Sequence, residues 1–169
     1  ESGTPFTGTV TSLWWLKSIE VQASASSGAI AAFGDSITDG TCTTLDAHDR
    51  WENLLSVRLA LEHDAAVRAG LGAVERWRAV LNEGIGGNTL TREGLNPGPD
   101  SPTGVERLER DVLSHHGVDT VVLFMGTNDI RRGASASQVI AAMTTIAQRV
   151  RAAGIRVIGV TIIPRHNVP

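Results

Sequence analysis

The sequence predicts an α/β fold in which a parallel sheet carries helices on both faces. Apolar runs too short to be helices alternate with segments whose apolar residues recur at helical spacing. The clearest run, residues 120–125, is apolar almost throughout, which is typical of a parallel strand covered on both faces. The resulting alternation of strands and helices indicates a parallel sheet built from helical crossovers.

Residues 1–28 differ in character from the rest of the chain. Residues 1–9 are small and polar and read as a linker, whereas residues 11–21 alternate in polarity like a strand with one buried face. A second flexible joint follows at residues 24–28. We therefore expect residues 1–28 to be a linker or the tail of a preceding β-rich module, and residues 29–169 to form the α/β domain.

The first half of this domain is expected to contain two strands and two helices. Residues 29–33 form a short buried strand, and residues 50–62 form a helix. Residues 79–82 form a second strand, and the Gly- and Pro-rich residues 92–103 form an exposed loop. Residues 105–115 form the next helix. The apolar positions of the two helices are Trp51, Leu54, Leu55, Leu59 and Leu61 in the first, and Val105, Leu108, Val112 and Leu113 in the second.

The second half is expected to run from the strand at 120–125 through a helix to a last strand at 155–163. Ser135 and Gln138 have the spacing of a capping box at the start of this helix. Gly154 is well placed to end it.

Composition limits the classes of function. The chain has 169 residues, of which 41% are hydrophobic and 20% charged, so one domain with a sizeable core is expected. A net charge of -3 offers no basic stripe for nucleic acid, and no apolar run approaches the ~20 residues that span a bilayer. The single cysteine, Cys42, excludes an intrachain disulfide and a cysteine-rich zinc site. We expect no metal and no organic cofactor.

Three loops that follow strands carry the candidate chemistry. Ser36 lies where the first strand ends and the chain turns between two glycines, which makes it a candidate nucleophile, although the same residues could form only a turn. Because parallel strands bring such loops to one edge of the sheet, Gly87 and Asn128 are expected beside Ser36. A backbone N–H at a glycine and an asparagine amide can both donate to a developing oxyanion.

Three motifs, residues 34–40 (Gly-Asp-Ser-Ile-Thr-Asp-Gly), 82–88 (Asn-Glu-Gly-Ile-Gly-Gly-Asn) and 126–129 (Gly-Thr-Asn-Asp), together resemble the first three sequence blocks of the SGNH (GDSL-type) hydrolases. The resemblance covers residues 29–169. It implies a flavodoxin-like three-layer α/β/α fold and ester hydrolysis through a serine acyl-enzyme. By this match Ser36 is the nucleophile. Its N–H, the N–H of Gly87 and the Asn128 side chain form the oxyanion hole.

Other residues of the motifs are expected to shape the substrate site. Asp35 and Asn88 are assigned to it, chiefly as hydrogen-bond partners that fix the loops. His166 follows the last strand and resembles a pocket-wall position in some members of the family.

The general base is the missing part of this assignment. In the SGNH family the base is a histidine in a C-terminal Asp-x-x-His block, and this sequence contains no such block. His166 is a weak alternative, whereas the other histidines, at positions 48, 63, 115 and 116, look like surface or helix-end residues. We therefore expect an N-terminal portion of a longer hydrolase that lacks its C-terminal part. The expected partner is a complementary C-terminal fragment that supplies the catalytic Asp and His, or a second copy of the chain.

The leading hypothesis is a serine esterase or acylhydrolase that acts on small acyl esters, for example of acetylated carbohydrate. The alternatives are a catalytically silent carbohydrate-binding or scaffold protein, and an acyltransferase with a sugar acceptor. The habits of the family also suggest a secreted bacterial protein.

Overall fold

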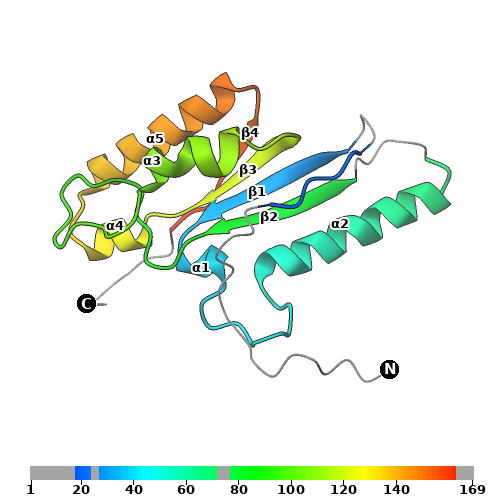
Figure 1. Ribbon diagram of the computed structural model, residues 1–169, viewed down its shortest axis with the longest axis horizontal. Helices are drawn as coiled ribbons and strands as arrows, with labels where there is room; N and C mark the ends of the chain where they lie inside the picture. Colours follow the sequence, from blue (N-terminus) through cyan, green and yellow to red (C-terminus); the bar gives the residue numbers. More distant parts are fainter. Residues whose placement is uncertain (1–17, 24–26, 72–76, 163–169) are drawn as a thin grey trace.

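A four-stranded parallel sheet organises the computed structural model, which describes residues 18–23, 27–71 and 77–162 (Figure 1). The strand order is β2-β1-β3-β4, and all neighbouring strands are parallel. This order matches the first four strands of the flavodoxin-like arrangement. The strands are β1 (Gly28–Gly34), β2 (Arg78–Gly84), β3 (Val118–Phe124) and β4 (Arg156–Gly159).

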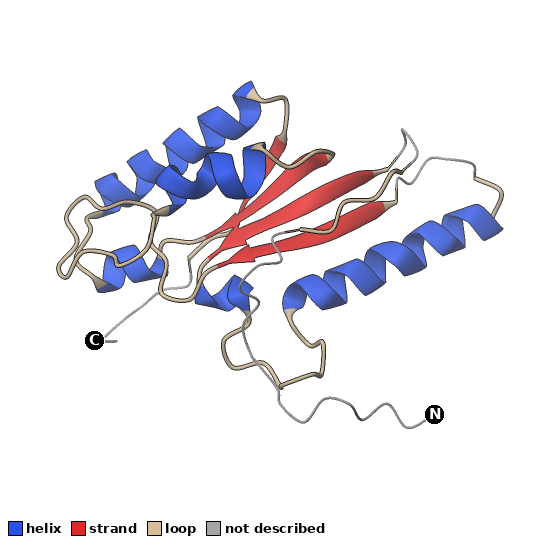
Figure 2. Cartoon of the chain, in the orientation of Figure 1, coloured by secondary structure: helices blue, strands red, loops and turns tan. Residues whose placement is uncertain are grey.

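Helices follow each of the first three strands (Figure 2). They are α1 (Ser36–Asp39), α2 (Trp51–Arg68), α3 (Gly104–Leu108), the π-helical turn η1 (Glu109–Leu113), α4 (Thr127–Arg131) and α5 (Ala136–Ala152). Right-handed crossovers put α2 on one face of the sheet, and α3, η1 and α5 on the other. The expected parallel sheet with helices on both faces is confirmed.

The hydrophobic core lies mainly on the face covered by α3, η1 and α5. In β1, Ala31 and Phe33 join this core, whereas the intervening buried residue Ala32 faces the opposite layer. The helices contribute Leu108, Val112, Val139, Ala142, Ile146 and Val150. The two central strands, β1 and β3, are thus packed against the helices of this face.

The strand register brings three loops to one edge. Gly34, near the end of β1, is the register partner of Gly84 at the end of β2 and of Phe124 at the end of β3. The segments that carry Ser36, Gly87 and Asn128 therefore begin side by side. The sequence-based expectation that they share an edge is confirmed at the level of the backbone.

The helix expected at residues 50–62 is six residues longer at its C-terminus, since α2 ends at Arg68. Its alanine-rich last turns have high helix propensity, which the expected boundary ignored. Leu54 and Leu61, which we expected to face inward, are 59% and 63% exposed. Trp51, Leu55 and Leu59 are partly buried instead.

The helix expected at residues 105–115 is divided into α3 and η1. The Ser114 N–H bonds to the Glu109 carbonyl at 2.9 Å, the i→i+5 bond of a π-turn. Its most buried positions include Arg107 and Asp111 as well as Leu108 and Val112, whereas Val105 and Leu113 are only partly buried.

The capping box expected at Ser135 is confirmed. The Ser135 hydroxyl accepts from the Gln138 N–H, and the Gln138 side chain accepts from the Ser135 N–H. Gly154 follows the helix with φ +76°. The last strand is shorter than expected, because β4 covers only residues 156–159 of the predicted 155–163.

The strand expected at residues 11–21 is wrong where the structure describes it. Residues 18–23 join no strand of the sheet, and Ile19 and Val21 are 78% and 79% exposed. Alternating polarity alone does not make a strand without a neighbour for its hydrogen bonds. Residues 11–17 and the linker at 1–9 lie outside the described residues, and the division at residue 28 stays a prediction.

Two further findings bear on function. Cys42 is a free, exposed thiol. Among the helices in the described ranges, none has the length and apolar character needed to cross a membrane.

Candidate active site

Ser36 is the first residue of α1, directly after β1. The Asp35 carboxylate accepts a hydrogen bond from the Ile37 N–H at 3.0 Å and so caps this short helix. The Ser36 carbonyl accepts from the N–H groups of Gly40 and Thr41. Ser36 itself is half-buried, and its hydroxyl bonds to no described residue. At the end of β1, hydrogen bonds therefore hold the backbone of Ser36 in place, and its hydroxyl has no hydrogen-bond partner among the described residues.

The end of β2 holds α1 in place. Asn82 Nδ2 donates to the Thr38 carbonyl at 2.7 Å, across the gap between the strand and the helix. A Cβ at Gly84 would lie 2.1 Å from the Asp39 nitrogen. Only glycine permits this close approach, so Gly84 allows the Ser36 helix to pack against β2.

The loop that follows β2 is tied to the loop that follows β1. The Ile85 N–H donates to the Gly34 carbonyl at 3.2 Å, and the Asn88 N–H closes a turn on the Ile85 carbonyl at 3.1 Å. Gly87 adopts φ +71° within this turn, a conformation that glycine reaches without strain. The N–H groups of Ser36 and Gly87 bond to no described residue. Both backbone donors are therefore available to a ligand.

Asn128 brings a third donor to the same edge. It lies in α4 after β3, is 8% exposed, and donates from Nδ2 to the Asn88 carbonyl at 2.9 Å. An asparagine amide carries two N–H bonds, so one remains for another acceptor. The hydrogen bond places the Asn128 side chain directly beside the residue that follows Gly87.

Asp129 fixes the chain on the far side of this loop. Its carboxylate accepts from the Leu90 N–H at 2.9 Å and from the Thr91 N–H at 3.1 Å. Burial raises the pKa of Asp129, and these two hydrogen bonds oppose that rise. Asp129 therefore acts as an internal support of the loop, as we expected for the polar residues of the motifs.

Asp35 and Asn88, which we assigned to the substrate site, are 1% and 0% exposed. Asn88 Nδ2 donates to Ser101 Oγ at 3.1 Å and to the Pro102 carbonyl at 2.8 Å. Their side chains hold the loops and do not face solvent. His166 lies outside the described residues, so its expected place in the pocket wall is a prediction.

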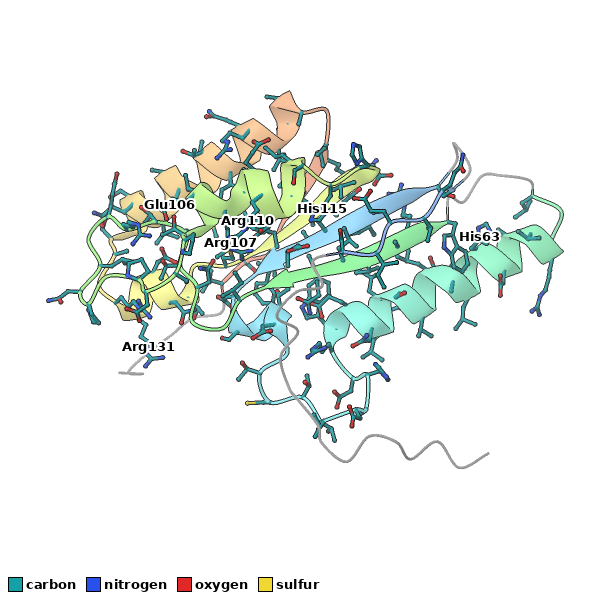
Figure 3. All side chains as sticks on the ribbon, in the orientation of Figure 1. His63, Glu106, Arg107, Arg110, His115 and Arg131 are labelled. Carbon is teal, nitrogen blue, oxygen red and sulfur yellow. The ribbon has the colours of Figure 1, made fainter. Side chains whose placement is uncertain are left out.

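Arg107 is the residue of this region that the sequence analysis missed. Figure 3 shows it between α3 and the sheet, and its guanidinium bonds to the ends of β1 and β2 and to Asn88. Although burial alone would raise the pKa of the adjacent Asp111, hydrogen bonds from Arg110 and Arg107 hold it below its usual value. The signal was present in the sequence: Arg107 and Asp111 are an oppositely charged i, i+4 pair among apolar helix positions.

Figure 3 labels two of the described histidines, and His63 lies toward the opposite end of the sheet. His63 contacts Trp77, which precedes β2, with ring centroids 5.2 Å apart. His115 Nε2 lies 3.4 Å from Glu83 Oε1, and the residue itself precedes β3. His116 is its neighbour, and His48 lies in the exposed loop before α2. No described histidine bonds to Ser36.

No group of three His, Cys, Asp or Glu side chains in the described ranges is arranged to hold a metal ion. The candidate reactive groups at this edge of the sheet are the Ser36 hydroxyl, the N–H groups of Ser36 and Gly87, and the Asn128 amide.

Solved structures with the same fold include several esterases. AlinE4, described as an SGNH-hydrolase family esterase, has 20% sequence identity and a TM-score of 0.60, covering 81% of this chain and 60% of that chain. TesA has 27% identity and a TM-score of 0.60, covering 79% of this chain and 60% of that chain. The psychrotrophic esterase EstA from Pseudoalteromonas sp., inhibited by monoethylphosphonate, has 19% identity and a TM-score of 0.55, covering 78% and 58%. The chain thus spans about 60% of the length of these relatives.

Sequence comparison gives the family. No curated protein matches the chain significantly. The family model described as GDSL-like Lipase/Acylhydrolase family matches residues 32–169, which contain all three motifs and the whole edge described above. The chain belongs to the GDSL-like lipase/acylhydrolase family.

Proposed function

We propose that this protein hydrolyses carboxylic esters through an acyl-enzyme on Ser36. One observation carries the proposal. At the ends of three adjacent strands, a serine hydroxyl and the N–H groups of Ser36 and Gly87 have no described partner, and the Asn128 amide keeps one free hydrogen. Unpaired donors beside a nucleophile are what acyl transfer requires. Membership of the GDSL-like family supports the same reaction.

In this mechanism, Ser36 Oγ attacks the ester carbonyl carbon and its proton passes to a general base. The carbonyl oxygen becomes negative and accepts from the Ser36 N–H, the Gly87 N–H and Asn128 Nδ2. Because these donors are already in place, they need no reorganisation as the charge develops. The alcohol leaves with a proton from the base, and water then attacks the acyl-enzyme to release the acid and free Ser36.

The general base is proposed to be a histidine outside the described residues. Two sources are considered: His166, and an Asp-His pair outside residues 1–169, either in the rest of a longer polypeptide or in a complementary fragment.

The proposed substrates are esters with small acyl groups, including acetyl esters of carbohydrate, and the proposed setting is extracellular. Both rest on the habits of the family. Comparison of acetyl, butyryl and octanoyl p-nitrophenyl esters, and of acetic acid release from acetylated xylan, measures this preference directly.

The function is tested by p-nitrophenyl acetate turnover of the natural full-length protein. Ser36→Ala is expected to reduce turnover to the buffer background, because it removes the nucleophile. Ser56→Ala, at an exposed position of α2, is the matched control and should turn over like the wild type. Wild-type turnover that survives Ser36→Ala, or a wild-type protein without turnover, contradicts the proposal.

The base is tested in the same assay with His166→Ala and with intact masses of every polypeptide in the sample. An active His166→Ala variant supports a base outside residues 1–169, and the intact masses show whether that base lies on a longer chain or on a second polypeptide. Loss of activity in His166→Ala, with the chain alone in the sample, assigns the base to His166.

A further inference from the structure

Arg107 is a fully buried cation at the edge where the candidate active site lies. Its side chain is 0% exposed. Nη2 donates to the Gly34 carbonyl at 2.8 Å, Nε to Asn88 Oδ1 at 2.9 Å, and Nη1 to the Glu83 carbonyl at 3.0 Å and Asp111 Oδ2 at 2.9 Å. Its Cζ lies 4.1 Å from the centre of the Phe33 ring. The guanidinium thus uses its planar fork of donors to join separate elements.

Two of these bonds, to the Gly34 carbonyl and to Asn88 Oδ1, end close to a proposed catalytic group. Gly34 precedes Ser36 by two residues, and its carbonyl also accepts from the Ile85 N–H of the Gly87 loop. Asn88 follows Gly87 directly, and its carbonyl accepts from Asn128 Nδ2. A continuous set of hydrogen bonds therefore runs from the Ser36 strand through Arg107 and Asn88 to Asn128.

We propose that Arg107 is a positioning residue, which sets the placement of the Ser36 nucleophile relative to the oxyanion donors of Gly87 and Asn128. This inference rests on the proposed esterase function. Arg107 is screened from solvent by Phe33 and α3, so it acts through the loops that it holds.

The energetics favour a role in placement. Burying a charge is costly unless it is paired and hydrogen-bonded, and Arg107 meets this condition with a carboxylate, two carbonyls and an amide oxygen. A misplacement of about 1 Å in a catalytic constellation can cost about 10²-fold in rate. Loss of the guanidinium removes its bonds to Gly34, Glu83 and Asn88. The Ile85 N–H bond to the Gly34 carbonyl is then the remaining backbone bond between the two loops in the described part of the chain.

The test compares Arg107→Met with Arg149→Met in the natural full-length protein. Arg149, in α5, is the matched control. It donates to the Val105 carbonyl at 2.8 Å and to Glu109 at 3.3 Å, which lie in α3 and η1, and no described bond joins it to the loops that carry Ser36 and Gly87. Competent sites are counted with an activated phosphonate ester that labels the serine, and kcat is expressed per counted site. This separates slower chemistry from a smaller folded fraction.

Arg107→Met is expected to lower kcat per site by about 10- to 100-fold with little change in KM, because the donors act on the transition state. Arg149→Met should retain the wild-type kcat. Arg107→Lys keeps the charge without the planar fork, so a smaller loss is expected; it decides the question if Arg107→Met does not fold. Unchanged kcat per site in the folded Arg107 variant, or an equal loss in Arg149→Met, overturns the proposal.

Hydrogen–deuterium exchange distinguishes failure of this proposal from failure of the esterase function. If the wild type shows no Ser36-dependent turnover, the function fails. The role of Arg107 is then decided by the amide exchange rates of residues 34–40 and 84–90. Faster exchange there in Arg107→Met than in Arg149→Met supports the role, and equal exchange overturns it.

Discussion

Asn128 serves two acceptors with one amide in the proposed site. One hydrogen of Nδ2 bonds to the Asn88 carbonyl, and the other is assigned to the substrate oxyanion. Asn128→Ala is expected to lower kcat by about 10²–10³-fold, the effect of removing one oxyanion donor, with a smaller change in KM. Steady-state kinetics with p-nitrophenyl acetate measure this. Thr145→Ala, on the exposed side of α5, is the control, and equal kinetics in the two variants would contradict the role of Asn128.

Glu52 gives a pH-dependent prediction at the residue scale. It is 4% exposed in the first turn of α2, and both carboxylate oxygens lack a hydrogen-bond partner in the described part of the chain. Burial raises the pKa of Glu52 above its ordinary value of 4.5. Its own backbone N–H and then the charge of Arg50 oppose this rise, and the charge of Asp39 adds to it. The folded state therefore favours the neutral acid, and stability is lost as the pH rises through the raised pKa.

Glu52→Gln removes this titration. The variant is expected to gain several degrees in Tm over the wild type at pH 7 and almost nothing at pH 4, where the wild-type side chain is mostly protonated. Thermal unfolding followed by circular dichroism at the two pH values measures the difference. An equal shift in Tm at both pH values would rule out a buried, titrating carboxylate.

At the residue scale, local sequence patterns predicted the functional residues in the loops that follow the strands. They did not predict Arg107, which connects these loops. Ser36, Gly87 and Asn128 follow apolar runs, so their edge could be predicted from the strand order. Arg107 lies 19 residues after Asn88 and 73 after Gly34 in the chain, and two of its four partners are backbone carbonyls. A carbonyl has no sequence signature, so the pairing of Arg107 with Asp111 could be read from the sequence, whereas its bonds to the Gly34 and Glu83 carbonyls could not.

At the scale of the elements, α3 begins with a capping box that involves a salt bridge. The Glu106 carboxylate accepts from the Thr103 N–H at 2.8 Å and from Arg92 Nε at 2.7 Å. The hydrogen bond from Arg92, followed by that from Thr103, lowers the pKa of Glu106 to about 2. The stabilisation is present above pH 4.5 and is lost as the pH falls through about 2.

Glu106→Gln is therefore expected to lower Tm by a few degrees at pH 7, and this loss should shrink as the pH falls toward and through about 2. Because this pair is exposed, added salt should reduce the difference at pH 7. Exposed Glu93 provides the control variant, Glu93→Gln, which should match the wild type. A loss of Tm in Glu106→Gln that grows as the pH falls would contradict a lowered pKa at this carboxylate.

The boundaries of the elements were harder to predict than their order. The capping box of α5 lies within four residues and was predicted correctly. The end of α2 has no such cap, and the helix that was expected as one piece is divided into α3 and η1 close to the buried pair Arg107 and Asp111. Local signals therefore predict caps well, whereas tertiary contacts decide where a helix changes its geometry.

At the scale of the whole molecule, the two helical layers differ in how firmly they are anchored. The helix α5 buries Val139, Ala142, Ile146 and Val150, whereas Glu52 is the only fully buried residue of the similarly long α2, which the structure describes throughout. Segments with few buried apolar contacts open at lower free energy. The amides of residues 55–66 in α2 are thus expected to exchange at least about ten times faster than those of residues 139–150 in α5, by hydrogen–deuterium exchange. Equal protection of the two helices would contradict this asymmetry.

The most direct test of the account is the site of covalent modification by an activated phosphonate ester, measured by intact mass and peptide mapping of the natural protein. A nucleophilic serine beside three N–H donors predicts one adduct, on the peptide that contains Ser36, and none in Ser36→Ala. An adduct on another residue, an adduct that persists in Ser36→Ala, or no adduct on the wild type would contradict the assignment of Ser36 as the nucleophile.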